Sequence, residues 1–236
     1  MRVAGRMTRE VLELVRSLVK PGVTTLELDQ AAEARTKELG AIPAFKNYHG
    51  YPAVLCASVN GEVVHGIPSA KRVLREGEII SIDFGVIMDG FCGDSAITVP
   101  VGEVSADAKK LLEVTEKSLY AGIAVVKPGA TLGDVGSAVQ TVAEAAGFSV
   151  VRDFVGHGIG RSMHEDPQVP NYGHPGRGMK LRAGMVIAIE PMINAGKPEV
   201  VVLKDGWTAV TEDGSMSAHF EHTVAVTANG ARILTE

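Results

Sequence analysis

Apolar side chains recur every three or four residues in four stretches of the chain. These stretches are residues 1–19, 25–39, 106–126 and 132–146. The first ends before Pro21-Gly22, a pair that cannot continue a helix, while Thr24 or Thr25 can cap the second and Gly40 can end it. The pattern therefore predicts four helices in two pairs.

Two other stretches, residues 77–99 and 184–202, are rich in the residues of β-strands. In the first of them Asp89-Gly90 is a two-residue turn signal between an apolar strand and a return strand. Such a hairpin places Asp83 opposite Ala96 and makes Asp94 the diagonal neighbour of Asp83. Diagonal neighbours have Cα atoms about 7 to 8 Å apart on one face, so both carboxylates can reach a common ion.

The order of helices and strands is duplicated along the chain. Three blocks share an offset of 107 residues: Val19–Thr24 recurs as Val126–Thr131, Gly40 as Gly147, and Leu74–Asp83 as Leu181–Glu190. Chance does not readily give three blocks one offset. We therefore expect a single α+β domain over residues 1–236, with halves of about 1–105 and 106–236 related by pseudo-symmetry and a site between them.

The duplication matches Asp83 with Glu190, each at the end of an apolar strand, where a carboxylate has no packing role. His157 lies among glycines, and Glu221 lies in a β-prone run. Isolated acids of this kind are as often solvent-facing turn residues, but a symmetric pair favours function. Four carboxylates and one imidazole are a donor set suited to a pair of first-row divalent ions.

Composition narrows the class of protein. With 236 residues, 45% of them hydrophobic and 22% charged, the chain can form a sizeable core. A net charge of -5 without a Lys/Arg block argues against a nucleic-acid partner. No apolar run approaches the roughly 18 residues of a membrane span, so we expect no membrane association and a cytoplasmic protein. Two cysteines are too few for a disulfide framework.

Over essentially its whole length the sequence resembles the type I methionine aminopeptidases, which have the pita-bread fold. The matching segments are Tyr48-His49-Gly50-Tyr51-Pro52, Val63-Val64-His65-Gly66-Ile67-Pro68, Asp83 with Asp94, Gly156-His157-Gly158-Ile159-Gly160-Arg161, Ile189-Glu190-Pro191-Met192 and Glu221-His222-Thr223. The resemblance implies a central curved antiparallel sheet covered by helices, in two pseudo-symmetric halves.

The resemblance also implies roles for individual residues. The metal ligands would be Asp83, Asp94, His157, Glu190 and Glu221, with Asp94 and Glu221 bridging two ions of Co, Mn, Fe or Zn. The substrate would be contacted by His65 and His164, and the methionine pocket would be lined by Tyr48, Tyr51, Cys56, Met163 and Trp207. A monovalent cation would lie near Asn60 and Ser217. The position of Met163 is commonly aromatic in relatives, which leaves the pocket shape open.

The activity implied is metal-dependent removal of the first methionine from peptides and nascent proteins that have a small second residue. Two adjacent cations would lower the pKa of a shared water toward neutrality, and the resulting hydroxide would attack the first peptide carbonyl. Glu190 would accept and transfer the proton, while His65 and His164 would orient the scissile peptide. We expect a monomer, with the ribosome as a candidate partner.

Two alternatives remain from the sequence. Prolidase or aminopeptidase P shares the fold and the ligand pattern, but those enzymes usually carry an additional N-terminal domain, and the Tyr-rich segment with Trp207 favours methionine. A non-catalytic peptide-binding homologue would typically lack ligands, whereas all five are present. The other histidines, His49, His174, His219 and His222, are interpreted as surface residues or as supports for the site.

Overall fold

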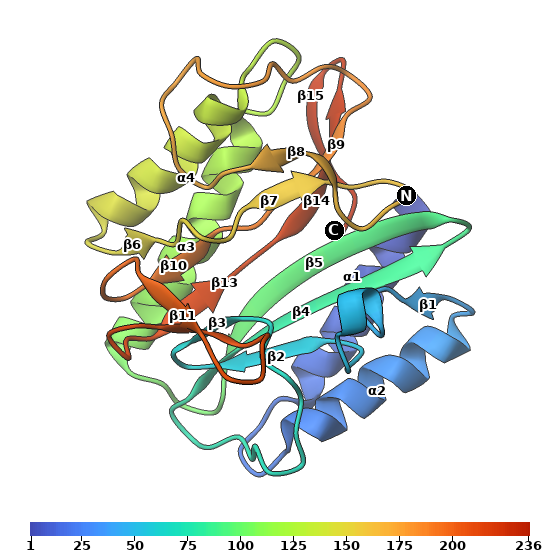
Figure 1. Ribbon diagram of the computed structural model, residues 1–236, viewed down its shortest axis with the longest axis vertical. Helices are drawn as coiled ribbons and strands as arrows, with labels where there is room; N and C mark the ends of the chain where they lie inside the picture. The colour runs from blue at the N-terminus through green and yellow to red at the C-terminus, as the bar shows by residue number, and fades with distance from the viewer.

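A computed structural model describes residues 1–236, and it places two helix pairs outside a set of antiparallel strands (Figure 1). The helices are α1 (Arg2–Leu18), α2 (Thr25–Glu38), α3 (Ala106–Ala124) and α4 (Leu132–Ala145). Each boundary lies within two residues of the sequence prediction, which confirms the four helices. None of them is long and apolar enough to span a lipid bilayer.

The strands form four small antiparallel sheets. In the first half they are β1 (Ile42–Pro43), β2 (Cys56–Val59), β3 (Glu62–Val64), β4 (Ile79–Met88) and β5 (Phe91–Pro100), with a short 3-10 turn η1 (Tyr48–Gly50). In the second half they are β6 (Ser149–Val150), β7 (Gly156–Gly158), β8 (Glu165–Val169), β9 (Val186–Ile189), β10 (Met192–Asn194), β11 (Val200–Val202), β12 (Ala209–Thr211), β13 (Ser217–His219), β14 (His222–Thr227) and β15 (Gly230–Ile233).

Each of the four sheets has its own order of strands. One sheet has the order β1-β4-β2 with β5 on β4, and another has the order β15-β14-β9-β7-β8. The two smaller sheets are β13-β10-β6 and β11-β12-β3. Helices α1 and α2 cover the β4–β5 side, while α3 and α4 cover the second half (Figure 1). The architecture is the expected α+β pita-bread fold.

The β4–β5 hairpin has the predicted register, with Asp83 opposite Ala96 and Asp94 opposite Gly85. One expectation was wrong, because Asp83 does not end its strand. β4 continues to Met88, since the strand ends where the Asp89-Gly90 turn begins and not where the apolar run is interrupted by a charge. Glu190, by contrast, directly follows the last residue of β9.

The local geometry of the two halves repeats at the offset found in the sequence. Thr24 caps α2 in a capping box with Glu27, and Thr131 caps α4 in a capping box with Asp134. Two isolated β-bridges are related in the same way, Thr24 with Val73 and Thr131 with Lys180. Individual hydrogen bonds at the helix caps and β-bridges therefore follow the same pseudo-symmetry. Two copies of one folding unit would have this property.

Hydrogen bonds across the centre join the halves. The backbone N–H of Glu221 donates to the carbonyl of Ala96 at 2.9 Å, and the Ser95 hydroxyl donates to the carbonyl of Glu221 at 2.6 Å. The Thr223 hydroxyl donates to the carbonyl of Asp94 at 2.7 Å and accepts from its N–H at 3.1 Å. These bonds fix β5 against the start of β14, and so fix two acidic side chains relative to each other.

Glycine at position 93 allows α1 to lie directly on β5. A Cβ at Gly93 would lie 2.8 Å from the backbone of Ala4 and of Gly5, closer than any real contact. The Thr8 hydroxyl also donates to the carbonyl of Gly93 at 3.0 Å, which shows how close the helix and the strand are.

We therefore expect Gly93→Ala to lower the free energy of unfolding by about 2 kcal/mol, because the added methyl must displace the helix. Urea unfolding followed by circular dichroism measures the change. Ser17→Ala, on the exposed end of α1, is the control and should change stability by less than about 0.5 kcal/mol. Equal stability of Gly93→Ala and the unmodified protein would refute the close-packing account.

Candidate metal centre

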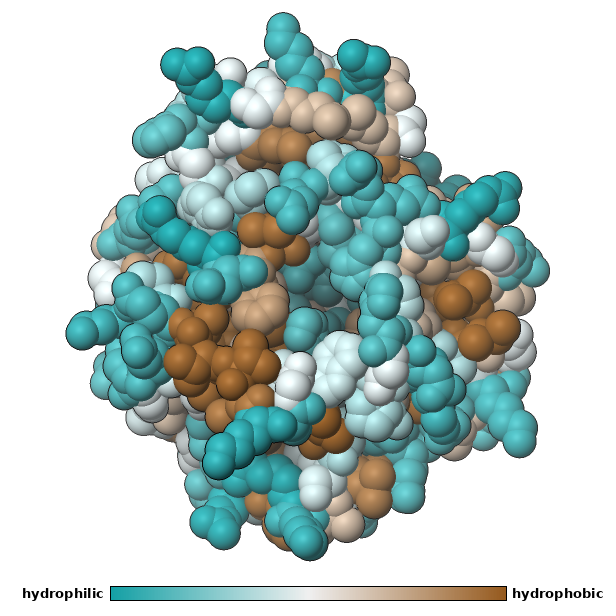
Figure 2. All heavy atoms as spheres, viewed as in Figure 1, coloured by the Kyte–Doolittle hydropathy of each residue, from teal (hydrophilic) through white to brown (hydrophobic).

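The face of the molecule shown in Figure 2 is hollowed near its centre. The residues that line a cavity of about 350 Å³ there come from both halves of the chain. One group contains all five expected metal donors, Asp83, Asp94, His157, Glu190 and Glu221. The other group is mainly aromatic and apolar, with three further histidines: Phe45, Tyr48, His49, Tyr51, Cys56, Val64, His65, His164 and Trp207.

The five donors reach the cavity from separate strands. Asp83 and Asp94 lie on the paired strands β4 and β5, and His157 is the middle residue of β7. Glu190 follows β9 and Glu221 precedes β14, two strands that pair with each other. Strand pairing thus brings together residues that lie far apart in sequence. The hairpin pattern in the sequence predicted this only for Asp83 and Asp94.

The orientation of His157 leaves one ring nitrogen free for a ligand. Its Nδ1 lies 2.8 Å from the carbonyl oxygen of Gly158, and a carbonyl can only accept, so Nδ1 carries the proton. The unprotonated Nε2 then faces the carboxylates, 3.5 Å from Glu190 Oε1 and 3.9 Å from Asp94 Oδ2. A backbone partner on the far nitrogen is the usual arrangement of a histidine that binds a metal.

The protein satisfies the hydrogen-bonding capacity of these carboxylates only in part. One oxygen of each is buried without a hydrogen-bond partner: Asp83 Oδ1, Asp94 Oδ1, Glu190 Oε1 and Glu221 Oε1. Donor atoms of Asp94, His157 and Glu221 all lie within 4.8 Å of one another. Buried carboxylates are normally paired or bound to a metal, so this donor set fits divalent cations.

Burial shifts the pKa values of all five donor side chains. It raises the pKa of Asp94 to about 7, and it raises the pKa values of Glu190 and Glu221 well above their ordinary range, with repulsion from Asp94 adding to the effect. Burial and repulsion from Asp94 and Glu190 likewise raise the pKa of Asp83. Burial lowers the pKa of His157 to about 4, so its imidazole is neutral at pH 7.

Two histidines lie beside the acidic group without joining it. The Nδ1 of His164 is 2.9 Å from the Tyr48 hydroxyl, and its ring centroid is 4.2 Å from that of His157. His65 follows β3, and burial, with a smaller effect of His164, lowers its pKa to about 4. A neutral His65 can donate one hydrogen bond to a polar group in the cavity.

The aromatic wall of the cavity is held by specific contacts. The Tyr51 hydroxyl is 3.1 Å from the carbonyl of Leu55 and 3.0 Å from that of Gly66, and it donates to them. Trp207 packs edge-on against Tyr51, with ring centroids 5.1 Å apart. Burial raises the pKa of the Cys56 thiol well above its ordinary value, so Cys56 contributes an uncharged, packed side chain.

The structure changes the membership of the expected pocket. Met163 does not line the cavity; it is buried behind it, where its Cε would lie 2.7 Å from a Cβ at Gly85. Phe45, Val64 and His49 do line it, although the sequence analysis did not assign them there. The sequence contained a signal for each of them, because Val64 and His49 lie within the matching segments and Phe45 lies three residues before Tyr48.

The other residues named in the sequence analysis do not line the cavity. Ser217 donates its N–H to the carbonyl of Asn60 at 2.9 Å, and neither residue lines the cavity. His222 is buried, with its ring nitrogens near Thr235 and Tyr120, and His174 is exposed. His219 is not a surface residue, because β13 carries it into the interior, 3.9 Å from Glu190.

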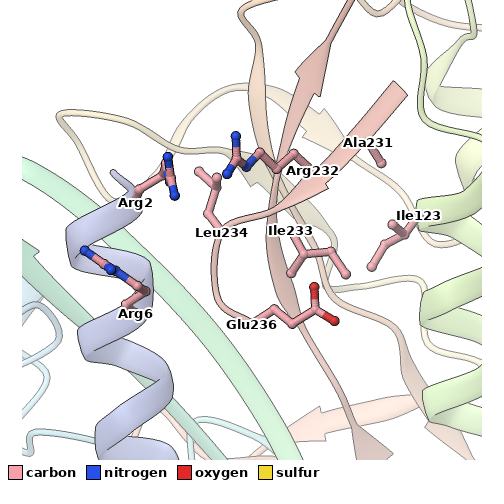
Figure 3. A pocket seen from close by; sticks show the side chains of 8 residues that line it. All are labelled: Arg2, Arg6, Ile123, Ala231, Arg232, Ile233, Leu234 and Glu236. Carbon is pink, nitrogen blue, oxygen red and sulfur yellow. The ribbon is translucent and has the colours of Figure 1, made fainter. Parts of the chain in front are cut away.

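A second hollow, of about 480 Å³, lies between α1 and β15 (Figure 3). Its polar side chains are Arg2, Arg6, Arg232 and Glu236, and the rest of its lining is apolar. It contains no histidine or cysteine and one carboxylate, so it lacks the donors for a metal ion. The cavity with the five donors is therefore the candidate site.

Comparison with known proteins agrees with this geometry. The model of metallopeptidase family M24 matches residues 1–228. Methionine aminopeptidase 1 of Bacillus subtilis is 55% identical over 235 residues, which cover 100% of this chain and 94% of that protein. The crystal structure of a Thermotoga maritima methionine aminopeptidase superposes with a TM-score of 0.99 at 50% identity, covering 100% of this chain and 95% of the other.

A prolidase from Pyrococcus horikoshii has the same fold, with a TM-score of 0.80, but it is 23% identical, and the alignment covers 60% of its chain. That likeness concerns the fold alone, whereas the methionine aminopeptidases match in sequence over nearly their whole length. The chain belongs to metallopeptidase family M24 and, within it, to the methionine aminopeptidases.

Proposed function

We propose that this chain removes the N-terminal methionine from peptides and nascent proteins with a small second residue, using two divalent ions held in the cavity. One observation carries the proposal. Four buried carboxylates with unpartnered oxygens converge with the free Nε2 of His157 at one end of a cavity whose other wall is aromatic and apolar.

The ligands of the two ions would be Asp83, Asp94, His157, Glu190 and Glu221. The closeness of the donor atoms of Asp94, His157 and Glu221 to one another supports their part in this set. Mn, Fe, Co and Zn all suit this oxygen and nitrogen set. When bound, such ions would activate a water molecule and polarise the scissile carbonyl.

The protein's own groups would position the substrate and move the proton. Glu190 would take a proton from the attacking water and pass it to the departing amine, a role that its carboxylate can fill because one of its oxygens has no hydrogen-bond partner in the protein. His65 and His164 would donate hydrogen bonds to the scissile peptide. Their place beside the acidic group, outside the donor set, supports that role.

The aromatic wall would hold the methionine side chain. Tyr48, Tyr51, Cys56 and Trp207, together with Phe45, give an apolar lining in which a thioether makes favourable contacts with ring edges. Met163 would act from behind this wall, by supporting it. Cys56 would act by packing and not as a nucleophile, because its pKa is raised.

The proposal extends to the domain organisation, oligomeric state and location of the enzyme. The 236 residues would act as a single catalytic domain and as a monomer in the cytoplasm, with chains emerging from the ribosome among the substrates. One cluster of buried apolar side chains, extending from Ala4 to Val226, supports the single domain. A monovalent cation would lie near Asn60 and Ser217, whose backbones are hydrogen-bonded to each other.

The substrate class can be tested directly. With added Mn²⁺ or Co²⁺, we expect hydrolysis of Met-Gly-Met and Met-Ala-Ser but none of Xaa-Pro dipeptides, because the aromatic wall fits a methionine side chain. Release of free methionine, measured by chromatography, gives the result. Preferential cleavage of the Xaa-Pro peptides would establish the prolidase alternative instead.

Removing one proposed bridging charge tests the metal centre. We expect Asp94→Asn to lower kcat/KM by about a thousandfold or more and to reduce bound metal, because the neutral amide is a poor ligand. Metal content by mass spectrometry is measured beside activity. Asp89→Asn, in the exposed turn of the same hairpin, is the matched control and should keep both. Full activity in Asp94→Asn would refute the assigned site.

The raised carboxyl pKa values predict how stability depends on pH. Above about pH 7.5 the buried histidines are neutral in both states, while the buried carboxyls hold protons only in the folded protein. Because the folded state then binds more protons than the unfolded state, Tm of the metal-free protein should fall from about pH 7.5 to pH 8.5.

Added metal should reverse this trend, because binding requires the carboxylates to lose their protons. The rise in Tm caused by excess Mn²⁺ should therefore be larger at about pH 8.5 than at about pH 7.5. Thermal melts with EDTA and with Mn²⁺ across this range provide the measurement. A metal-free Tm that increases with pH would contradict the protonation described here.

A further inference from the structure

Three consecutive large apolar side chains are exposed on one hairpin beside the cavity. Val201, Val202 and Leu203 are 44%, 55% and 43% exposed, and we call them the β11 patch. Figure 2 shows apolar atoms gathered on this face at one side of its central hollow, where Figure 1 places β11 and β12. Contiguous exposed apolar residues of this kind mark interaction surfaces more often than chance.

The same strand has a free backbone edge. β11 pairs only with β12, at the end of the sheet β11-β12-β3. The N–H of Leu203 donates to Thr208, and Glu199 accepts from Glu212, which fixes the alternation of bonded positions. Because bonded positions alternate along an antiparallel pair, the N–H and C=O of Val202 point away from β12. They are available to another extended chain.

The edge is continuous with the proposed substrate cavity. β3, at the other side of this sheet, leads into His65, and the loop between β11 and β12 carries Trp207; both residues line the cavity. The loop that follows β11 carries Trp207 into the cavity lining, so a peptide that leaves the cavity can pass the end of β11. An extended peptide advances about 3.3 Å per residue, so three residues beyond the cleaved bond span about 10 Å.

We propose that the substrate polypeptide, from about its fourth residue onward, adds to the free edge of β11 as an extended strand and packs apolar side chains on the β11 patch. This inference rests on the proposed function, because the substrate must leave the cavity as an extended chain. Strand addition to an open sheet edge gives affinity through backbone hydrogen bonds and preference through side-chain contacts. The enzyme would then favour longer substrates with apolar residues at positions four to six.

Peptide length and sequence test the proposal. The substrates are Met-Ala-Ser, the octapeptide Met-Ala-Ser-Val-Leu-Val-Ser-Lys, and Met-Ala-Ser-Ser-Gly-Ser-Ser-Lys. We expect kcat/KM for the apolar octapeptide to exceed that for the tripeptide by about fivefold. Val202→Pro removes the outward N–H, which proline tolerates at an edge, and should abolish this gain while leaving tripeptide turnover unchanged.

A second variant separates side-chain packing from backbone pairing. Val201→Ser with Leu203→Ser should remove the preference for the apolar octapeptide over the serine-rich one. Val73→Ser is the matched control, because Val73 is 41% exposed and does not line the cavity, and it should change neither ratio. Amide hydrogen exchange at Val202 should also slow when an octapeptide with a reduced first peptide bond is added.

The possible outcomes distinguish this inference from the proposed function. Equal kcat/KM for the tripeptide and the apolar octapeptide, or an undiminished gain in Val202→Pro, would overturn the strand addition. Protection of Val202 that depends on protein concentration and not on peptide would overturn it in favour of a dimer through β11. Failure to cleave Met-Ala-Ser would refute the proposed function, and the exchange experiment would then decide the β11 edge alone.

Discussion

The structure depends on holding four carboxylates together out of water. Isolated in an apolar interior such charges are strongly unfavourable, and their mutual repulsion adds to the cost. Asp83, Asp94, Glu190 and Glu221 nevertheless converge, each with a buried oxygen that no protein donor reaches. Only protons or cations can balance this arrangement. The surrounding structure must therefore hold these four side chains in place against their mutual repulsion.

Strand pairing between the halves provides the restraint. The Thr223 and Ser95 side chains bond to the backbones of Asp94 and Glu221, so the carboxylates are fixed through the main chain and not through their own oxygens. Their oxygens therefore stay free for ligands. The pseudo-symmetry of the two halves suits this purpose, because it brings a matched pair, Asp83 within β4 and Glu190 directly after β9, to one cavity.

The selective part of the site departs from that symmetry. The first half contributes Tyr48, Tyr51 and His65 to the cavity, while the second half contributes His164 and Trp207. Trp207 also ties the cavity to the β11–β12 hairpin, because the loop between these two strands carries it. The proposed metal donors thus include one pair that the pseudo-symmetry matches, Asp83 and Glu190, whereas the proposed substrate contacts come from positions that it does not match.

The sequence by itself determined the four helices, the register of the β4–β5 hairpin and the candidate donors, because caps, Pro-Gly stops and a two-residue turn act through neighbours in the chain. It placed Asp83 at a strand end, where the structure has it mid-strand, and it put Met163 in the cavity lining. Only the tertiary structure decided that Met163 lies behind the wall, that Phe45 lines it and that His219 is buried beside Glu190. The positions of these side chains depend on which strands lie together in the fold, and the local sequence does not specify this.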